Sequence, residues 1–421
     1  MVRYLPQFGY DPVVVTAPGP KDERWTPIDD ALHSGVPGDI DVRRVAGPEP
    51  ASSTGWRHRA ERWLRLRDAW TRSWIERSTA LGIEAAREAD VELVYAWMQP
   101  YPSAEAAAQI ARAVRRPWVA DLGDPWALDE MMIYPTGLHR QLERRLMRRV
   151  LGTAAAIVLS TPEAERRVAS AFPELAGKVF TIPNGFDRAE FAEPAPARDD
   201  DAFRIVHTGY LHTELGHRQR RTAPLRRLLG GAVEGVDILS RSPIYLIEAV
   251  ERVRRERPDL AERLEVHFAG VLSPRDVAVA RRSPATRILG FLSHEDSRAL
   301  VRTADLLFLP MHDLPAGSRA TVVPGKTYEY VASGRPILAA VPEGDARDLL
   351  AAAGTATLCR PTDSGAIADA IVAAYERAQG GSPAPKVPEQ LLGRNEYRSL
   401  ARELAGVFDQ VRRVPAAPAL G

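Results

Sequence analysis

The stretch VPGKTYEYVASGRP, residues 323–336, decides the fold of this chain. Pro324 suits the first turn of a helix, because its ring presets the backbone angle and its missing N–H is not needed there. Gly334 and Pro336 then end the helix. One apolar strand precedes it at 306–310, and a second follows at 337–341. This order predicts a strand–helix–strand unit in a parallel sheet.

The start of this helix has the chemistry of a phosphate site. Lys326 and Glu329 are three residues apart, so they lie at neighbouring points on one face of the helix. The free N–H groups of a helix N-terminus carry about half a positive charge and attract anions. Lys326 adds a full charge, and the Glu329 carboxylate can accept hydrogen bonds from a sugar diol. A surface helix with a weak Lys–Glu pair explains these two residues, but not the whole pattern.

Composition narrows the class of protein. The 421 residues suggest two or three domains, and 45% hydrophobic with 26% charged residues is ordinary for a globular protein. With 56 Lys and Arg against 55 Asp and Glu, the net charge of +1 does not call for a nucleic acid partner. The single cysteine, Cys359, excludes an intramolecular disulfide and a cysteine metal cluster. No signal peptide or membrane span is visible, so the sequence predicts a cytoplasmic protein.

Apolar strands alternate with helical segments along the whole chain. The strands are expected near residues 12–16, 39–45, 91–97, 118–120, 154–160, 179–182, 203–208, 264–269, 288–292, 306–310, 337–341 and 355–358. A Pro, Ala and Asp-rich linker at 193–201 separates two such series. The sequence therefore predicts an α/β fold of two doubly wound, Rossmann-like domains that face a cleft.

Three segments together resemble a known family. The pattern Pro-Gly-Lys-x-x-Glu-Tyr-x-Ala-x-Gly-x-Pro at 324–336 resembles the donor-binding helix of GT-B glycosyltransferases, in particular the retaining family 4. IPNGFD at 182–187 is similar to the sequence that closes the N-terminal domain in that family, and DLGDPW at 121–126 resembles its Asp-x-x-Asp-Pro-Trp variant. The resemblance implies transfer of a sugar from a nucleotide-diphosphate sugar to an acceptor hydroxyl, with retention and without a metal or other cofactor. It further implies a role in cell-envelope glycan, glycolipid or glycoside biosynthesis.

The same resemblance implies a division of the chain. Residues 1–193 would form the acceptor-side domain and 201–385 the nucleotide-sugar domain, with a helix at 394–413 crossing back to the first. The family's first strand and its Gly-rich loop would lie upstream of Met1, so we expect the recorded start to be late or the gene to be truncated.

The resemblance also implies site residues. Asp124, Arg241 and Lys326 are the expected catalytic residues, the last two as neutralisers of the departing diphosphate. Asp121 and Trp126 are acceptor-side candidates. Asp before Pro is also common in turns, so a purely structural role is the other interpretation. This interpretation stays open for Asp124 and is favoured for Asp121. The expected donor-binding residues are Gly209, Phe291, Leu292, Val323, Gly325 and Glu329.

Two departures from the family pattern leave alternatives open. Many members carry Glu-x7-Glu, but here Glu329 is the second Glu and Thr321 stands where the first belongs. This could mean altered sugar choice, Asp313 in that role, or lost activity. The segment from His212 to Ser240 is longer than a usual βα loop and rich in arginine, which would suit a flap or an acceptor contact. A non-catalytic relative that binds nucleotide sugar or scaffolds a partner, and a nucleotide-sugar epimerase, are the alternative functions.

The stretch from Trp56 to Arg77 is unusual. Trp56, Trp63 and Trp70 recur every seven residues, among arginines that include Arg59 and Arg62. A basic helix with tryptophans is typical of peripheral attachment to a membrane surface. An amphipathic helix packed on its own domain is the other interpretation.

Overall fold

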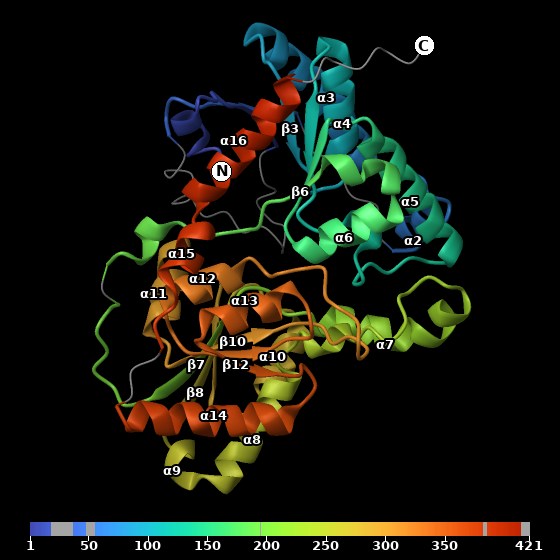
Figure 1. Cartoon of the computed structure of the whole chain (residues 1–421). Coiled ribbons are helices and arrows are strands. Elements are labelled where there is room, and N and C mark those ends of the chain that lie inside the picture. Colours follow the sequence, from blue (N-terminus) through green and yellow to red (C-terminus); the bar gives the residue numbers. More distant parts are fainter. Residues whose placement is uncertain (18–36, 48–54, 194, 382–384, 414–421) are drawn as a thin grey trace.

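The computed structural model describes residues 1–17, 37–47, 55–193, 195–381 and 385–413, without the side chains of residues 58, 59 and 62. It has two α/β domains, each built on parallel strands, and Figure 1 shows the first domain above the second. The predicted fold class is therefore confirmed. Within the described ranges, no helix is both long and apolar enough to cross a membrane.

The second domain contains a six-stranded parallel sheet with the order β12-β11-β10-β7-β8-β9. Its strands are β7 (Phe203–Thr208), β8 (Leu264–Ala269), β9 (Thr286–Gly290), β10 (Leu306–Pro310), β11 (Ile337–Ala340) and β12 (Ala356–Cys359). All five residues of β10 are buried, as expected for a central parallel strand covered on both faces. β10 and β7 are neighbours in the middle of the sheet, so their carboxyl ends lie side by side.

Helices cover both faces of this sheet. One buried cluster joins the strands to α8, α10 and α14, and another joins them to α11, α12 and α13. Figure 1 shows α14 and α8 below the sheet and α12 and α13 above it. The helices are α7 (Thr213–Leu228), α8 (Ile244–Glu256), α9 (Pro258–Ala261), α10 (Pro274–Ala280), α11 (His294–Thr303), α12 (Lys326–Ser333), α13 (Asp345–Ala353) and α14 (Ser364–Gln379).

The first domain contains a four-stranded parallel sheet in the order β3-β4-β5-β6, and a separate two-stranded parallel sheet of β1 and β2. The strands are β1 (Val13–Thr16), β2 (Asp41–Arg44), β3 (Val94–Trp97), β4 (Trp118–Asp121), β5 (Ala156–Leu159) and β6 (Val179–Thr181). The helices are α2 (Gly55–Trp63), α3 (Ala69–Glu88), α4 (Ser103–Val114), α5 (Gly137–Gly152) and α6 (Pro162–Ala171). The expected further strand before β1 stays a prediction.

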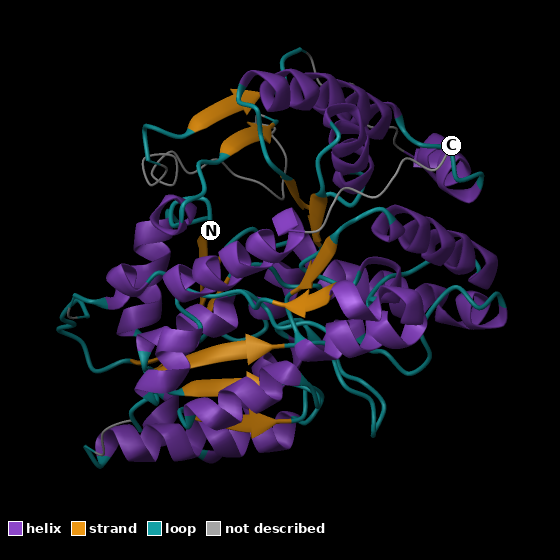
Figure 2. Ribbon diagram, turned by 45° about the horizontal axis from the view of Figure 1, so that its top comes forward, coloured by secondary structure: helices purple, strands orange, loops and turns teal. Residues whose placement is uncertain are grey.

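The C-terminal helix α16 (Tyr397–Arg413) completes the first domain, whereas Leu391 and Leu392 of α15 (Glu389–Arg394) pack against the second. Side chains of β5 alternate between two cores, because successive residues of a strand point to opposite faces. Ile157 and Leu159 pack with α4, α5 and α6, whereas Ala156 and Val158 pack with α16. Figure 2 gives a second view of the layers. Short 3-10 helices are η1 (Leu5–Phe8), η2 (Trp126–Leu128), η3 (Pro173–Lys178), η4 (Arg188–Phe191) and η5 (Ile238–Ser240).

Two segments differ from the sequence-based expectation. The tryptophan-rich stretch is not one helix, because α2 ends at Trp63 and Asp68 caps a new helix, α3, by accepting from the Thr71 N–H. The long segment after His212 is largely helical, since α7 occupies its first half. The arginines Arg59 and Arg62 of the predicted basic helix have side chains outside the described part.

Candidate active site

The Lys326 ammonium lies between the carboxyl ends of the two central strands. Its Nζ donates to the Thr208 carbonyl at the end of β7 and lies 3.4 Å from His207 Nε2. The His207 Nδ1–H donates to the Phe308 carbonyl of β10 over 3.0 Å, which leaves Nε2 unprotonated toward Lys326. Burial first, and the Arg241 charge second, lower the pKa of Lys326 to about 7. Burial and the Lys326 charge likewise lower the pKa of His207.

Gly209 makes room for this lysine. Its φ of +99° favours glycine, and a Cβ at this position would lie 2.7 Å from Lys326 Nζ. The Thr208 N–H donates to the Tyr330 hydroxyl at 3.0 Å, and this hydrogen bond links the end of β7 to α12. The Gly209 N–H donates to the Ala269 carbonyl at 2.8 Å, so Gly209 serves the site by leaving room for the half-buried Lys326 ammonium.

Arg241 is the second cation of the site and follows η5 directly. It is half-buried, and its Nη1 lies 3.8 Å from Met131 Sδ of the first domain. Burial lowers the pKa of its guanidinium, while Asp124 and Asp129 raise it. In the described part of the chain it has no ion pair within 4 Å. An incoming anion could therefore bind it without displacing a carboxylate.

Two carboxyl groups of the first domain lie opposite Arg241. Asp124 is half-buried after β4, and burial raises its pKa while Arg241 lowers it. Asp129 is buried and accepts from the Met131 N–H at 2.8 Å. Burial, Glu130 and Asp124 together raise its pKa to about 7. Asp124 and the buried Asp129, which sequence reasoning missed, thus lie where their charges act on Arg241.

Glu130 brings a carboxylate of the first domain to Thr321 of the second. Its Oε1 accepts from the Thr321 N–H at 2.9 Å and lies 3.1 Å from His312 Nε2, and its Oε2 accepts from the Thr321 hydroxyl at 2.5 Å. Arg167 donates to Oε2 at 2.7 Å. Burial would raise the pKa of Glu130, but the hydrogen bonds from His312 and Thr321 lower it to about 2. A carboxylate therefore lies beside Thr321 although the sequence has none there.

Asp313, the sequence-based alternative to the missing glutamate, is engaged elsewhere. Its Oδ2 accepts from Arg360 Nε at 3.0 Å and from the Thr362 hydroxyl at 3.1 Å. Its backbone pairs with Asp237 in both directions. These contacts hold the loop after β10 and point the carboxylate toward the end of β12.

Glu329 is half-buried on α12, and burial raises the pKa of its carboxyl. His294 and Lys326 act in the opposite direction, so both lie near it. Phe291 is 48% exposed just after β9, and Leu292 is half-buried beside it. Gly325 is exposed at the start of α12, whereas the Val323 side chain is buried. The predicted donor-binding side chains thus follow β9 and β10, two strands of the same sheet that β7 and β8 separate.

Contacts within the first domain hold both acceptor-side candidates. The Asp121 carboxylate accepts from the Tyr95 hydroxyl of the adjacent strand and from the Gly123 N–H at 3.3 Å, so it stabilises the turn. Trp126 is 2% exposed, stacks on Tyr101 with ring centroids 5.2 Å apart, and donates from Nε1 to Glu143 at 3.0 Å. The Trp126 ring therefore lies in the core of the first domain.

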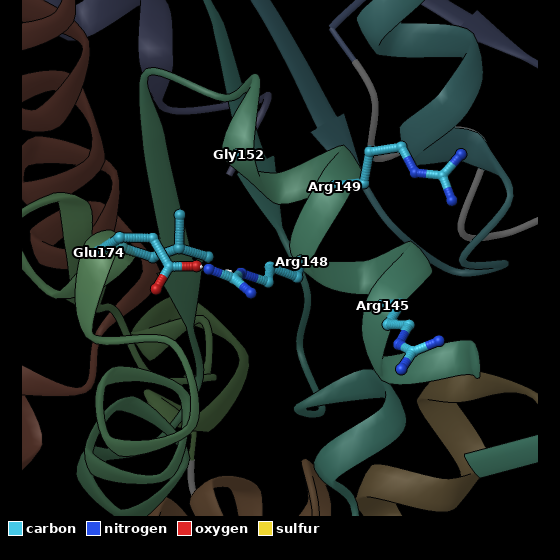
Figure 3. A pocket seen from close by; sticks show the side chains of 6 residues that line it. Arg145, Arg148, Arg149, Gly152 and Glu174 are labelled. Atoms are coloured by element: carbon cyan, nitrogen blue, oxygen red, sulfur yellow. Dashed lines mark hydrogen bonds and ion pairs between the residues drawn. The ribbon is translucent and has the colours of Figure 1, made fainter. Parts of the chain in front are cut away.

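Arginines line two hollows of the first domain away from Lys326. A groove of about 620 Å³ lies between α5, α6 and Val233, and its arginines are Arg140, Arg144, Arg166 and Arg167. Figure 3 shows a second hollow, of about 560 Å³, where Arg148 pairs with Glu174 and Arg145 and Arg149 extend alongside.

Comparison with known proteins finds one family match and several structures of similar fold. Residues 240–377 match the family model of the glycosyl transferases group 1. Among solved structures, Anabaena HepE in complex with UDP and glucose superposes with a TM-score of 0.58 at 14% identity, covering 95% of this chain and 100% of that one. A glycosyltransferase from Rickettsia africae gives 0.61 at 12% identity, covering 98% and 93%.

Sucrose-phosphate synthase from Thermosynechococcus elongatus gives a TM-score of 0.60 at 13% identity, covering 97% of this chain and 91% of that one. A comparison with curated protein sequences finds no significant match. The solved structures show that this chain has their two-domain fold. The match to the glycosyl transferases group 1 covers the segment that carries Arg241, Lys326 and Glu329.

Proposed function

We propose that the chain transfers a sugar, with retention and without a metal, from a nucleotide-diphosphate sugar to an acceptor hydroxyl. The observation that carries the proposal is the pair of half-buried cations, Lys326 and Arg241, near Gly209 at the carboxyl end of β7. Such a pair can neutralise the charge that develops on a departing diphosphate. Cell-envelope glycan, glycolipid or glycoside biosynthesis is the proposed context.

The chemistry assigns separate tasks to the two domains. Lys326 and Arg241 bind the two phosphates, and the Glu329 carboxylate accepts hydrogen bonds from the ribose hydroxyls. Asp124 orients the acceptor hydroxyl. The bond from the anomeric carbon to the diphosphate oxygen breaks, a bond to the acceptor oxygen forms on the same face, and the acceptor proton passes to the leaving phosphate. UDP is the first nucleotide to test, because HepE was solved with UDP.

Thermal stability with UDP, GDP, ADP and TDP tests the donor site. A ligand at about 100 times its Kd should add about 2.7 kcal/mol to the folded state. We expect one nucleotide to raise Tm by a few degrees, and Lys326→Ala and Arg241→Ala each to remove this shift. An unchanged shift in both variants would refute the phosphate site.

Activity assays then distinguish the alternative functions. Turnover with an acceptor identifies a transferase, and donor isomerisation without an acceptor identifies an epimerase. Nucleotide binding without either activity identifies a non-catalytic relative.

Glu329→Ala tests the ribose contact. Loss of a charged hydrogen bond should weaken binding of the preferred nucleoside diphosphate by about 1–3 kcal/mol. The same variant should bind inorganic pyrophosphate as the unaltered protein does, because the phosphates contact other residues. Titration calorimetry measures both affinities, and an equal loss for pyrophosphate would mean that Glu329 supports α12 and not the ribose.

A further inference from the structure

Most of the exposed large apolar side chains in the described part of the chain gather on three segments. We name this set the Trp–Leu face; its members are Trp56, Trp63, Leu64, Leu66, Leu138, Leu225, Leu228 and Leu229. Exposure is high at its centre, with 71% for Trp56, 61% for Leu138 and 83% for Leu228. Monomeric proteins rarely leave apolar side chains clustered in this way unless they bind something.

The three segments contact one another across the domain boundary. The Trp63 ring lies 5.2 Å from the His139 ring, and Arg65 Nη1 donates to the His139 carbonyl at 3.1 Å. At the start of the same helix, the Gly137 N–H donates to the Leu229 carbonyl of the second domain at 2.7 Å. Figure 1 shows α2, α5 and the far end of α7 on one side of the molecule. The Trp–Leu face is therefore continuous and belongs to both domains.

Neighbouring tryptophans show that exposure here is selective. Trp74 donates from Nε1 to Ser103 Oγ at 3.0 Å and Trp70 stacks on Trp74, so both pack on their own domain. Trp56 and Trp63 are seven residues apart on α2 and thus lie on one side of that helix. The packed-helix interpretation of this stretch therefore holds for α3, and membrane attachment stays a prediction for α2, whose tryptophans are exposed.

Positive charge accompanies the Trp–Leu face. Arg57, Arg65 and Arg67 are exposed on and after α2, where Arg65 pairs with Glu143 and Arg67 with Glu105. The helix α7 carries five arginines and one glutamate, and Arg218, Arg221 and Arg227 are exposed. Because the whole chain has a net charge of only +1, this basic character is local. Tryptophan and leucine next to arginine suit the boundary of an anionic bilayer, where rings enter the interface and guanidinium groups meet phosphates.

We propose that the Trp–Leu face docks on the surface of an anionic lipid bilayer. The face spans both domains, so docking sets the orientation of the whole molecule. The proposal concerns a surface remote from Lys326 and does not depend on the proposed function.

Vesicle flotation of the full chain tests this proposal. Vesicles of phosphatidylcholine are compared with vesicles that also contain phosphatidylglycerol, at low and at high salt. We expect flotation with the anionic vesicles, weakened by salt because the charges are screened. The triple variant Trp56→Ser, Trp63→Ser, Leu228→Ser should lower the partition coefficient by about tenfold or more. Arg218→Gln with Arg221→Gln should weaken flotation mainly at low salt.

Trp97→Ser is the matched control, because Trp97 is 57% exposed but lies outside the Trp–Leu face. It should float as the unaltered chain does. Absence of flotation in a folded sample, equal flotation with both vesicle types, or a control as defective as the triple variant would each overturn the proposal. Sedimentation that shows a dimer lost in the triple variant would assign the face to a second copy and also overturn it. Nucleotide binding is measured on the same samples and reports separately on the donor site.

Discussion

At the scale of single residues, the protonation of Lys326 is the most consequential property of the site. Its ammonium is held among carbonyls and imidazole, with Arg241 nearby, and its pKa is about 7. A bound diphosphate would favour the charged form and raise this pKa. Nucleotide affinity should therefore be highest below pH 7 and fall as pH rises toward 9, by up to about tenfold per pH unit.

Titration calorimetry of the preferred nucleotide between pH 6.5 and 9 measures this effect, and two buffers of different ionisation enthalpy reveal proton uptake at pH 8. Lys326→Arg is the control, because arginine stays charged and should flatten the profile. Constant affinity of the unaltered protein, with no proton uptake, would show that Lys326 is already charged before binding.

Some residues of the site could be predicted from the sequence and others could not. Lys326, Glu329 and Gly209 follow strand ends and precede or begin helices, so their local pattern predicts where they lie. Glu130 is separated from Thr321 by the interdomain linker, and no local pattern shows that the two will meet. The core position of Trp126 could not be predicted either, since its motif is visible in the sequence but its burial depends on Tyr101 and Glu143.

At the scale of elements, capped and amphipathic segments were predictable and polar ones were not. The helix α12 lies within the predicted segment, because Pro324 and Gly334 mark its two ends. The helix α7 carries Pro224 and many arginines and has little apolar periodicity, so its sequence resembles a loop. Its helical form depends instead on Gly216, which packs on the Leu239 backbone, and on Gln219, which bonds the Val236 carbonyl at 2.7 Å.

The helix α16 gives a test at this scale. Phe408 is 2% exposed and meets the rings of Tyr10 and Tyr95 with centroids 5.1 and 5.5 Å away. Phe408→Ala should lower the free energy of unfolding of the first domain by about 3–5 kcal/mol, because it leaves a cavity between α16 and the sheet. Urea unfolding followed by circular dichroism measures the change. Phe291→Ala removes a half-exposed ring and should cost about 0.5 kcal/mol or less; an equal loss in both would mean that α16 does not hold the domain.

At the scale of the whole molecule, the two domains are joined close to the site. Thr161 of the first domain donates its hydroxyl to the Thr321 carbonyl at 2.6 Å, and Arg167 donates to the Arg319 carbonyl at 2.9 Å. Glu130 receives hydrogen bonds from the same loop of the second domain. The loop between β10 and α12 therefore takes its shape partly from the other domain, and donor binding is expected to couple to domain closure.

Glu130→Gln tests this coupling. The glutamine amide keeps the shape of the glutamate but loses the negative charge that contacts Arg167 and His312. Breaking a buried ion pair lowers the free energy of unfolding by about 3–5 kcal/mol. We expect a larger radius of gyration by small-angle X-ray scattering and weaker nucleotide binding. In the unaltered protein, the low pKa of Glu130 keeps its contribution to stability complete above about pH 4.5, and acidification removes this contribution only as pH falls toward 2.

Glu174→Gln is the control. It breaks the exposed pair with Arg148 seen in Figure 3 and should leave the radius of gyration and the nucleotide affinity unchanged. If Glu130→Gln behaved like Glu174→Gln, the domains would be held by their other contacts, and the carboxylate at Thr321 would have no part in closing the site.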